Sequence, residues 1–79
     1  ITITHGSAIT IGAALLANGT GDIVIDSTGS TIDIDATVTT STGNIAIDAD
    51  STIDINAGIT TETGAITVEA DETTTVSEA

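Results

Sequence analysis

The chain has 79 residues, of which 12 are acidic and none is Lys or Arg, so its formal net charge is −12. This excess of negative charge without cations excludes binding to nucleic acid or to an anionic lipid surface, because both interactions need positive side chains. The absence of Cys excludes disulfides and thiolate metal sites. No apolar run approaches the roughly 18 residues of a membrane span, so direct membrane insertion is not expected.

Acidic chains with few aromatic residues are often disordered, but 39% of this chain is hydrophobic and its apolar residues are regularly spaced. The chain begins without Met, directly in the strand-like alternation Ile1-Thr2-Ile3-Thr4. We therefore expect a folded segment of a longer, processed polypeptide.

The first half of the sequence holds two repeats of one pattern. The first repeat, residues 1–19, starts with the alternation above and continues with SAITIGAALLANG from Ser7, which holds a second and a third strand. The second repeat, residues 20–41, consists of TGDIVIDS from Thr20, STIDIDA from Ser30 and TVTTS from Thr37. Apolar residues at i and i+2 in each piece predict strands with one buried face.

The second half of the sequence repeats the same order of strands. The third repeat, residues 42–62, consists of TGNIAIDA from Thr42, STIDINA from Ser51 and GITTE from Gly58. The fourth repeat, residues 63–79, consists of TGAITVEA from Thr63 and a degraded TTTVSEA from Thr73. The Thr-Gly starts at Thr20, Thr42 and Thr63 follow at intervals of 22 and 21 residues, and the whole sequence holds nearly four repeats.

A repeat of about 21 residues is too short for strand-helix crossovers, and no hairpin pattern links successive strands. We therefore predict an all-β fold, a parallel β-solenoid in which each repeat is one coil of three short strands. Equivalent strands would then stack at ~4.8 Å. The whole chain, residues 1–79, would form one such segment.

Stacked coils predict columns of inward side chains, in which each residue lies over its counterpart in the next coil. On the first face the columns are Ile1, Ile23, Ile45, Ile66 and Ile3, Ile25, Ile47, Val68. On the second face they are Ile9, Ile32, Ile53 and Ile11, Ile34, Ile55, Val76. Leu15, Val38 and Ile59 form the third face, and Ala13, Ala36 and Ala57 align at a corner.

The same register places acidic residues in outward columns. One column contains Asp26, Asp48 and Glu69, and another contains Asp33 and Asp54. Two carboxylates ~5 Å apart repel by roughly 1–3 kcal/mol, and no cation in the sequence neutralises them. Two interpretations stay open: a solvated surface screened by salt, or bound Ca²⁺, which prefers carboxylate oxygens.

Further acidic and amide side chains align outside these columns. Asp35 aligns with Asn56, and Asp22 with Asn44 at the start of a turn. The calcium-binding nonapeptide and the EF-hand loop are both absent. The Ca²⁺ hypothesis therefore rests on the acidic columns alone.

Two other residue types suggest functions that the pattern supports less well. Thr39 and Thr40 align with Thr60 and Thr61 as outward strand residues, and flat Thr ladders can bind ice. The Thr-x-Thr pair of Thr37 and Thr39 is interrupted in the next repeat, because Gly58 stands at the position of Thr37. His5 has no Ser–Asp constellation beside it and is expected to be an exposed turn residue. An enzyme is not expected, because the acids recur with the repeat and no single pair stands out.

The cadence TTxTGxIxIxAxSTIDIxAxITTxTG resembles the repeats of very large secreted bacterial surface proteins, including filamentous-haemagglutinin-like adhesins and autotransporter-type proteins. The resemblance implies a right-handed β-helix that forms stalks or fibres outside the cell. It implies a scaffold role for the strands around Ile23, Ile32, Ile45, Ile53 and Ile66. No binding motif of that family matches particular residues here.

The expected function is therefore that of a structural, non-catalytic segment of an extracellular bacterial fibre, sheath or adhesin stalk. Its expected partner is itself, end to end or laterally, and no cofactor is required. The alternative is a Ca²⁺-dependent adhesive module that uses the columns of Asp26, Asp48, Glu69, Asp33 and Asp54. Without Lys, Arg, aromatic residues, Cys or Met, the chain lacks many sites of proteolysis and oxidation, which suits long service outside a cell.

Overall fold

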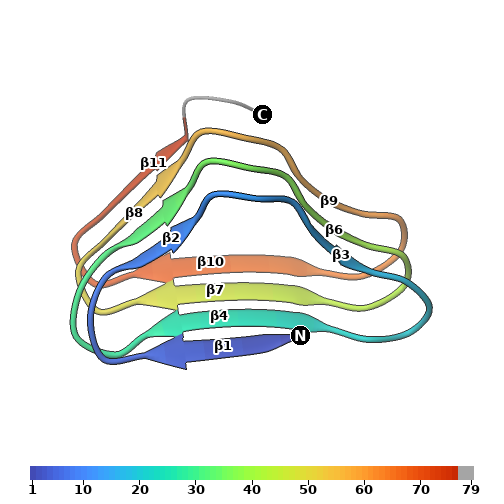
Figure 1. Cartoon of the computed structure of the whole chain (residues 1–79), viewed down its shortest axis with the longest axis horizontal. Helices are drawn as coiled ribbons and strands as arrows, with labels where there is room; N and C mark the ends of the chain where they lie inside the picture. The colour runs from blue at the N-terminus through green and yellow to red at the C-terminus, as the bar shows by residue number, and fades with distance from the viewer. Residues whose placement is uncertain (77–79) are drawn as a thin grey trace.

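The computed structural model describes residues 1–76, and the last three residues of the degraded fourth repeat, 77–79, lie outside the described part. Residues 1–76 form eleven β-strands and no helix. Figure 1 shows the chain winding repeatedly around a roughly triangular cross-section, with one sheet on each side. This arrangement is the predicted parallel β-solenoid.

Each side of the solenoid is one parallel sheet. The first sheet, in spatial order, contains β1 (Thr2–His5), β4 (Ile23–Ser27), β7 (Ile45–Ala49) and β10 (Ile66–Ala70). The second contains β2 (Ile9–Ile11), β5 (Ile32–Ile34), β8 (Thr52–Ile55) and β11 (Thr73–Val76). The third contains β3 (Leu15–Ala17), β6 (Val38–Thr40) and β9 (Ile59–Thr61). Three strands per coil are thus confirmed, and the described part of the fourth coil has two.

The strand register confirms the predicted stacking of like on like. Ile23 is in register with Ile45, and Ile45 with Ile66. On the second sheet, the step from Ile9 to Ile32 is one residue longer than the step from Ile23 to Ile45. The coils therefore differ in length by one or two residues. The extra residues lie in the corners, because the strands themselves stay in register.

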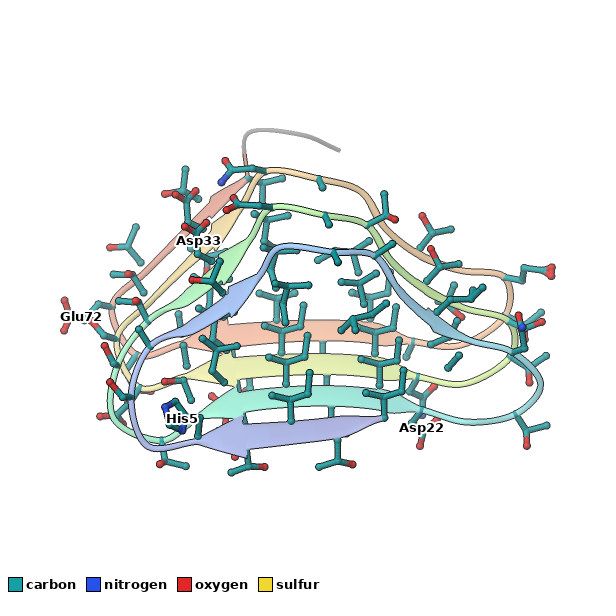
Figure 2. All side chains as sticks on the ribbon, viewed as in Figure 1. His5, Asp22, Asp33 and Glu72 are labelled. Carbon is teal, nitrogen blue, oxygen red and sulfur yellow. The ribbon has the colours of Figure 1, made fainter. Side chains whose placement is uncertain are left out.

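The predicted inward columns form the core. The central members are at most 3% exposed: Ile23, Ile25, Ile32, Ile34, Val38, Ile45, Ile47, Ile53 and Ile55. Figure 2 shows carbon-only side chains filling the space between the three sheets. β-Branched side chains have few rotamers, so identical residues can stack in a narrow interior at little entropic cost.

Some outermost members of the columns are exposed, although Ile9 and Ile11 at the start of the second-sheet columns are 7% and 6% exposed and remain buried. Ile1, Ile66 and Val76 are 47%, 45% and 58% exposed, although their columns are aligned as predicted. Each lies in the first or the last described coil and is therefore covered on one side only. At these three positions a second neighbouring coil would be needed to complete the burial.

The prediction that Thr40 is an outward residue is wrong. Thr40 is 1% exposed, and its hydroxyl donates to the Gly43 carbonyl at 2.7 Å. The half-buried Thr61, one coil further on, donates to the same Gly43 carbonyl at 3.0 Å and accepts from the Gly64 N–H at 3.0 Å. In the short strand β6, Val38 and Thr40 both point to the inner face. Thr40 can occupy this buried position because its hydroxyl is hydrogen-bonded to the backbone of the following corner.

Two corners contain side chains that bridge neighbouring coils. The Asp22 Oδ1 accepts from the Asn44 N–H at 2.7 Å, and the Asn44 Oδ1 accepts from the Ala65 N–H at 2.9 Å. At another corner the Ser27 hydroxyl, 1% exposed, donates to the Ser7 carbonyl at 2.7 Å. Among residues 1–76, every buried side-chain polar atom has a hydrogen-bond partner.

Candidate functional site

The acidic column on the first sheet lies where the sequence predicts it. Asp26 is in register with Asp48, and Asp48 with Glu69, on the outer face of β4, β7 and β10. β4 and β7 bury alternate residues, so Asp26 and Asp48 point away from the isoleucine core, and Glu69 continues their register on β10. Asp48 and Glu69 are exposed and Asp26 is half-buried. Thr4 continues the column on β1 without a charge.

A shallow pocket of about 280 Å³ opens beside this column, where the first sheet turns toward the second. Its walls are formed by Asp26, Ser27, Thr28, Asp48, Ala49, Asp50 and Asp71. Asp50 and Asp71 directly follow the ends of β7 and β10, and the strand pattern does not predict them as site residues. They are one coil apart in the sequence, the same step as from Ile45 to Ile66, and this spacing is the signal that could have placed them together.

The pocket gathers carboxylates, but their spacing does not form a compact ligand set. Among residues 1–76, no three His, Asp or Glu side chains are close enough together to hold one metal ion. Ca²⁺ takes six to eight oxygen ligands, of which water and backbone carbonyls can supply several. Calcium binding at Asp26, Asp48 and Glu69 therefore stays a prediction.

The second acidic column is organised by an amide. Asp33 and Asp54 are in register on β5 and β8, as predicted. The Asn56 side-chain amide donates to the Oδ1 of Asp35 at 3.0 Å and to the Oδ1 of Asp33 at 3.2 Å. One neutral group thus bridges two like charges, because the sequence has no Lys or Arg to do so.

The surroundings of Asp33 perturb the titration of its carboxyl group. Its pKa is raised above the usual 3.8, first by partial desolvation and then by the charges of Asp35 and Asp54. The hydrogen bond from Asn56 acts in the opposite direction and lowers the pKa. The net effect favours the protonated form of Asp33. Figure 2 shows Asp33 on the outer face of the second sheet.

The remaining candidates lie apart from these columns. His5 ends β1 and is exposed, as expected, at the corner opposite Asp22 in Figure 2. On the third sheet Thr39 is in register with Thr60 on one side but with Leu16 on the other. On the first sheet the outward register runs Thr2, Val24, Ala46, Thr67, so neither sheet has an unbroken Thr ladder. This interruption gives no support to an ice-binding face.

A second shallow groove of about 200 Å³ lies on the third sheet. Leu16, Asn18, Thr39, Thr40, Ser41 and Glu62 line it. Leu16 is 58% exposed, the register neighbour of Thr39 on an otherwise polar face. A single leucine without aromatic neighbours provides little surface for a sugar or a peptide to stack on.

Comparison of the sequence with protein-family profiles, with curated proteins and with solved structures finds no match. A search of residues 1–76 for a helix long and apolar enough to cross a membrane finds none.

Proposed function

We propose that the chain is a structural, non-catalytic β-solenoid segment of an extracellular bacterial fibre, sheath or adhesin stalk. The observation that carries this proposal is the continuity of the three parallel sheets, which stack like residues over like along one axis. Such a body resists bending because every coil is bonded to its neighbours on three sides. A stalk or fibre needs this property more than it needs a cleft.

The surface supports the same proposal. Its acids recur in columns, whereas a glycosidase needs one distinct carboxylate pair across a substrate. The absence of Lys, Arg and aromatic residues removes the cleavage sites of many proteases. The cadence of the repeat, which resembles that of bacterial surface adhesins, points to the same setting outside the cell.

We further propose that the segment associates with copies of itself end to end. Residues 1–21 contain no acidic side chain, whereas the described part of the fourth coil contains Glu69, Asp71 and Glu72. Stacking the first coil of one copy on the last coil of another therefore avoids opposing carboxylates. It would also cover the exposed Ile66 and Val76 and continue their columns. A head-to-tail contact of this kind propagates into a filament.

The test is electron microscopy of the full-length protein at increasing concentration, with diffraction from the assembled material. Filaments with an axial repeat of ~4.8 Å are expected, the spacing of stacked strands. Dispersed globular particles at all concentrations would overturn the self-association.

A matched pair of variants on β11 sharpens this test. Val76→Asn places an amide in the exposed end of an inward column, whereas Thr75→Asn changes the neighbouring position in register with Asp54. Val76→Asn should shorten or abolish filaments, and Thr75→Asn should not. Equal effects of the two variants would contradict the end-to-end contact and leave lateral association as the route.

The second candidate function is a Ca²⁺-dependent adhesive module. The pocket that brings Asp26, Asp48, Asp50 and Asp71 together is the observation that favours it. Calcium there would offset carboxylate repulsion and raise the melting temperature of the protein, and a chelator would reverse the rise. Asp48→Asn should remove most of this response, while Asp22→Asn, at the opposite corner, should retain it. An identical melting temperature with calcium and with chelator would eliminate the candidate.

A further inference from the structure

The corner between β3 and β4 contains the only Asn-Gly pair in the sequence, Asn18-Gly19. Both residues are exposed, and Gly19 has a positive φ of 85°. The Gly19 carbonyl accepts from the Thr42 N–H at 3.3 Å and from the Thr42 hydroxyl at 3.1 Å. Within residues 1–76, by contrast, neither the Asn18 side chain nor the Gly19 N–H makes a hydrogen bond.

The other two asparagines are held by the fold. The Asn44 Oδ1 accepts from the Ala65 N–H at 2.9 Å, and the following N–H, that of Ile45, donates to the Ala65 carbonyl. The Asn56 amide is engaged by two carboxylates, and a residue with a β-carbon follows it. Only at Asn18 are the amide carbon and the attacking backbone nitrogen both free.

We propose that Asn18 is a site of spontaneous deamidation. The Gly19 backbone nitrogen attacks the carbonyl carbon of the Asn18 amide, and a new bond forms between this carbon and that nitrogen. The bond from the amide carbon to its NH₂ group breaks, and the amine leaves as ammonia with the proton released from the Gly19 nitrogen. Water then opens the resulting succinimide. Hydrolysis at the former amide carbon gives aspartate, and hydrolysis at the backbone carbonyl carbon of residue 18 gives isoaspartate.

Deamidation at this corner has two physical consequences. Either product adds a carboxylate to the groove that already contains Glu62, in a sequence without Lys or Arg. The isoaspartate product also lengthens the backbone at the point where the Gly19 carbonyl is held by Thr42. The first change adds repulsion between position 18 and Glu62, and the second weakens the contact between Gly19 and Thr42 on the next turn.

The experiment is incubation of the folded full-length protein at mildly alkaline pH, followed by digestion with a protease that cleaves before Asp. Such cleavage separates the three asparagines into the peptides of residues 1–21, 35–47 and 54–70. The mass change from amide to carboxylate should appear in the peptide of residues 1–21 and not in the other two. Part of that peptide should also be cut anew before position 18, which reports the aspartate product, while the isoaspartate product stays uncut.

Two controls test whether the mass change arises at Asn18 and whether the folded structure permits the reaction there. Asn18→Gln should abolish the mass change in residues 1–21, because glutamine closes a less favourable ring. The protein unfolded in urea gives the rate of deamidation at Asn18 in the absence of folded structure. A folded rate at Asn18 far below that unfolded rate would overturn the proposal, and so would comparable reaction at Asn44 or Asn56.

Discussion

The carbonyl oxygen of Gly21 lies where a β-carbon on Gly43 would have to be, so the two corners are in direct backbone contact. Gly64 stands in the same relation to the Gly43 carbonyl one coil further on. Neither position has a left-handed backbone, since the only positive φ among residues 1–76 is that of Gly19. Glycine is required at these corners for close approach and not for an unusual dihedral angle.

Gly43→Ala is therefore expected to destabilise the protein by about 1–3 kcal/mol or more, because the backbone must shift to admit the methyl group. Gly21→Ala is the matched control, since a β-carbon there meets nothing within 4 Å. Urea denaturation followed by circular dichroism measures both. Equal losses for the two variants would show that the contact at Gly43 relaxes freely.

Ile25→Val tests the inward column at its most buried point. Ile25 is 0% exposed, so removing one methylene should cost about 0.5–1.5 kcal/mol. Val24→Thr changes the adjacent outward residue of β4 at nearly constant volume, and its effect should stay within about 0.5 kcal/mol. The comparison uses the midpoint of thermal unfolding. A larger loss at Val24 than at Ile25 would reverse the assignment of the two faces.

Thr40→Val isolates the buried hydroxyl of the third sheet. The change keeps the shape of the side chain but removes the 2.7 Å bond to the Gly43 carbonyl, so a loss of about 0.5–1.5 kcal/mol is expected. The Thr61 hydroxyl still donates to that carbonyl and limits the loss. Thr39→Val, on the outer face, should be neutral or slightly stabilising in the same denaturation experiment.

Asp33 should make the stability of the protein depend on pH in an unusual direction for a carboxyl group. The pKa of Asp33 in the folded state is raised above 3.8, the value for the unfolded chain. At a pH between 3.8 and the raised pKa, the folded state therefore binds more protons than the unfolded state. The contribution of Asp33 to stability therefore improves as pH falls through the raised pKa, and the improvement is complete below 3.8.

Asp33→Asn is the variant that reveals this dependence against the background of the other carboxyl groups. The variant should melt at a higher temperature than the native protein at neutral pH, and the difference should shrink as pH approaches 3.8. An NMR titration of the Asp33 carboxyl measures the raised pKa directly. A difference in melting temperature that is constant with pH would contradict the prediction.

The sequence predicts the fold well because one simple rule operates along it. Alternate aliphatic residues at a regular interval place Ile23, Ile45 and their counterparts in one column, and the structure confirms each register. Polar residues on the inner face escape this rule. Thr40 and Ser27 look like surface residues by composition, and their burial depends on carbonyls at corners, which hydrophobic periodicity does not describe. A glycine three residues after Thr40 and again after Thr61 is the local signal that distinguishes these threonines.

The candidate site is predictable to the level of columns and no further. The interval of one coil brings Asp26 to Asp48 and Asp33 to Asp54. The pocket involving Asp50 and Asp71 arises at a corner, where the polypeptide leaves the strand and the alternation of faces stops. Likewise, the bridge from Asn56 to Asp33 and Asp35 depends on side-chain direction, which strand periodicity does not specify.

The corners that absorb one or two extra residues also make the molecule adjustable in size. The step from Ile9 to Ile32 is two residues longer than the step from Ile32 to Ile53, yet both advance the same column by one rung. A tandem duplication of any one turn would preserve every ladder above and below it. The length of such a protein can therefore change in evolution through the number of coils, by about 4.8 Å for each coil gained or lost.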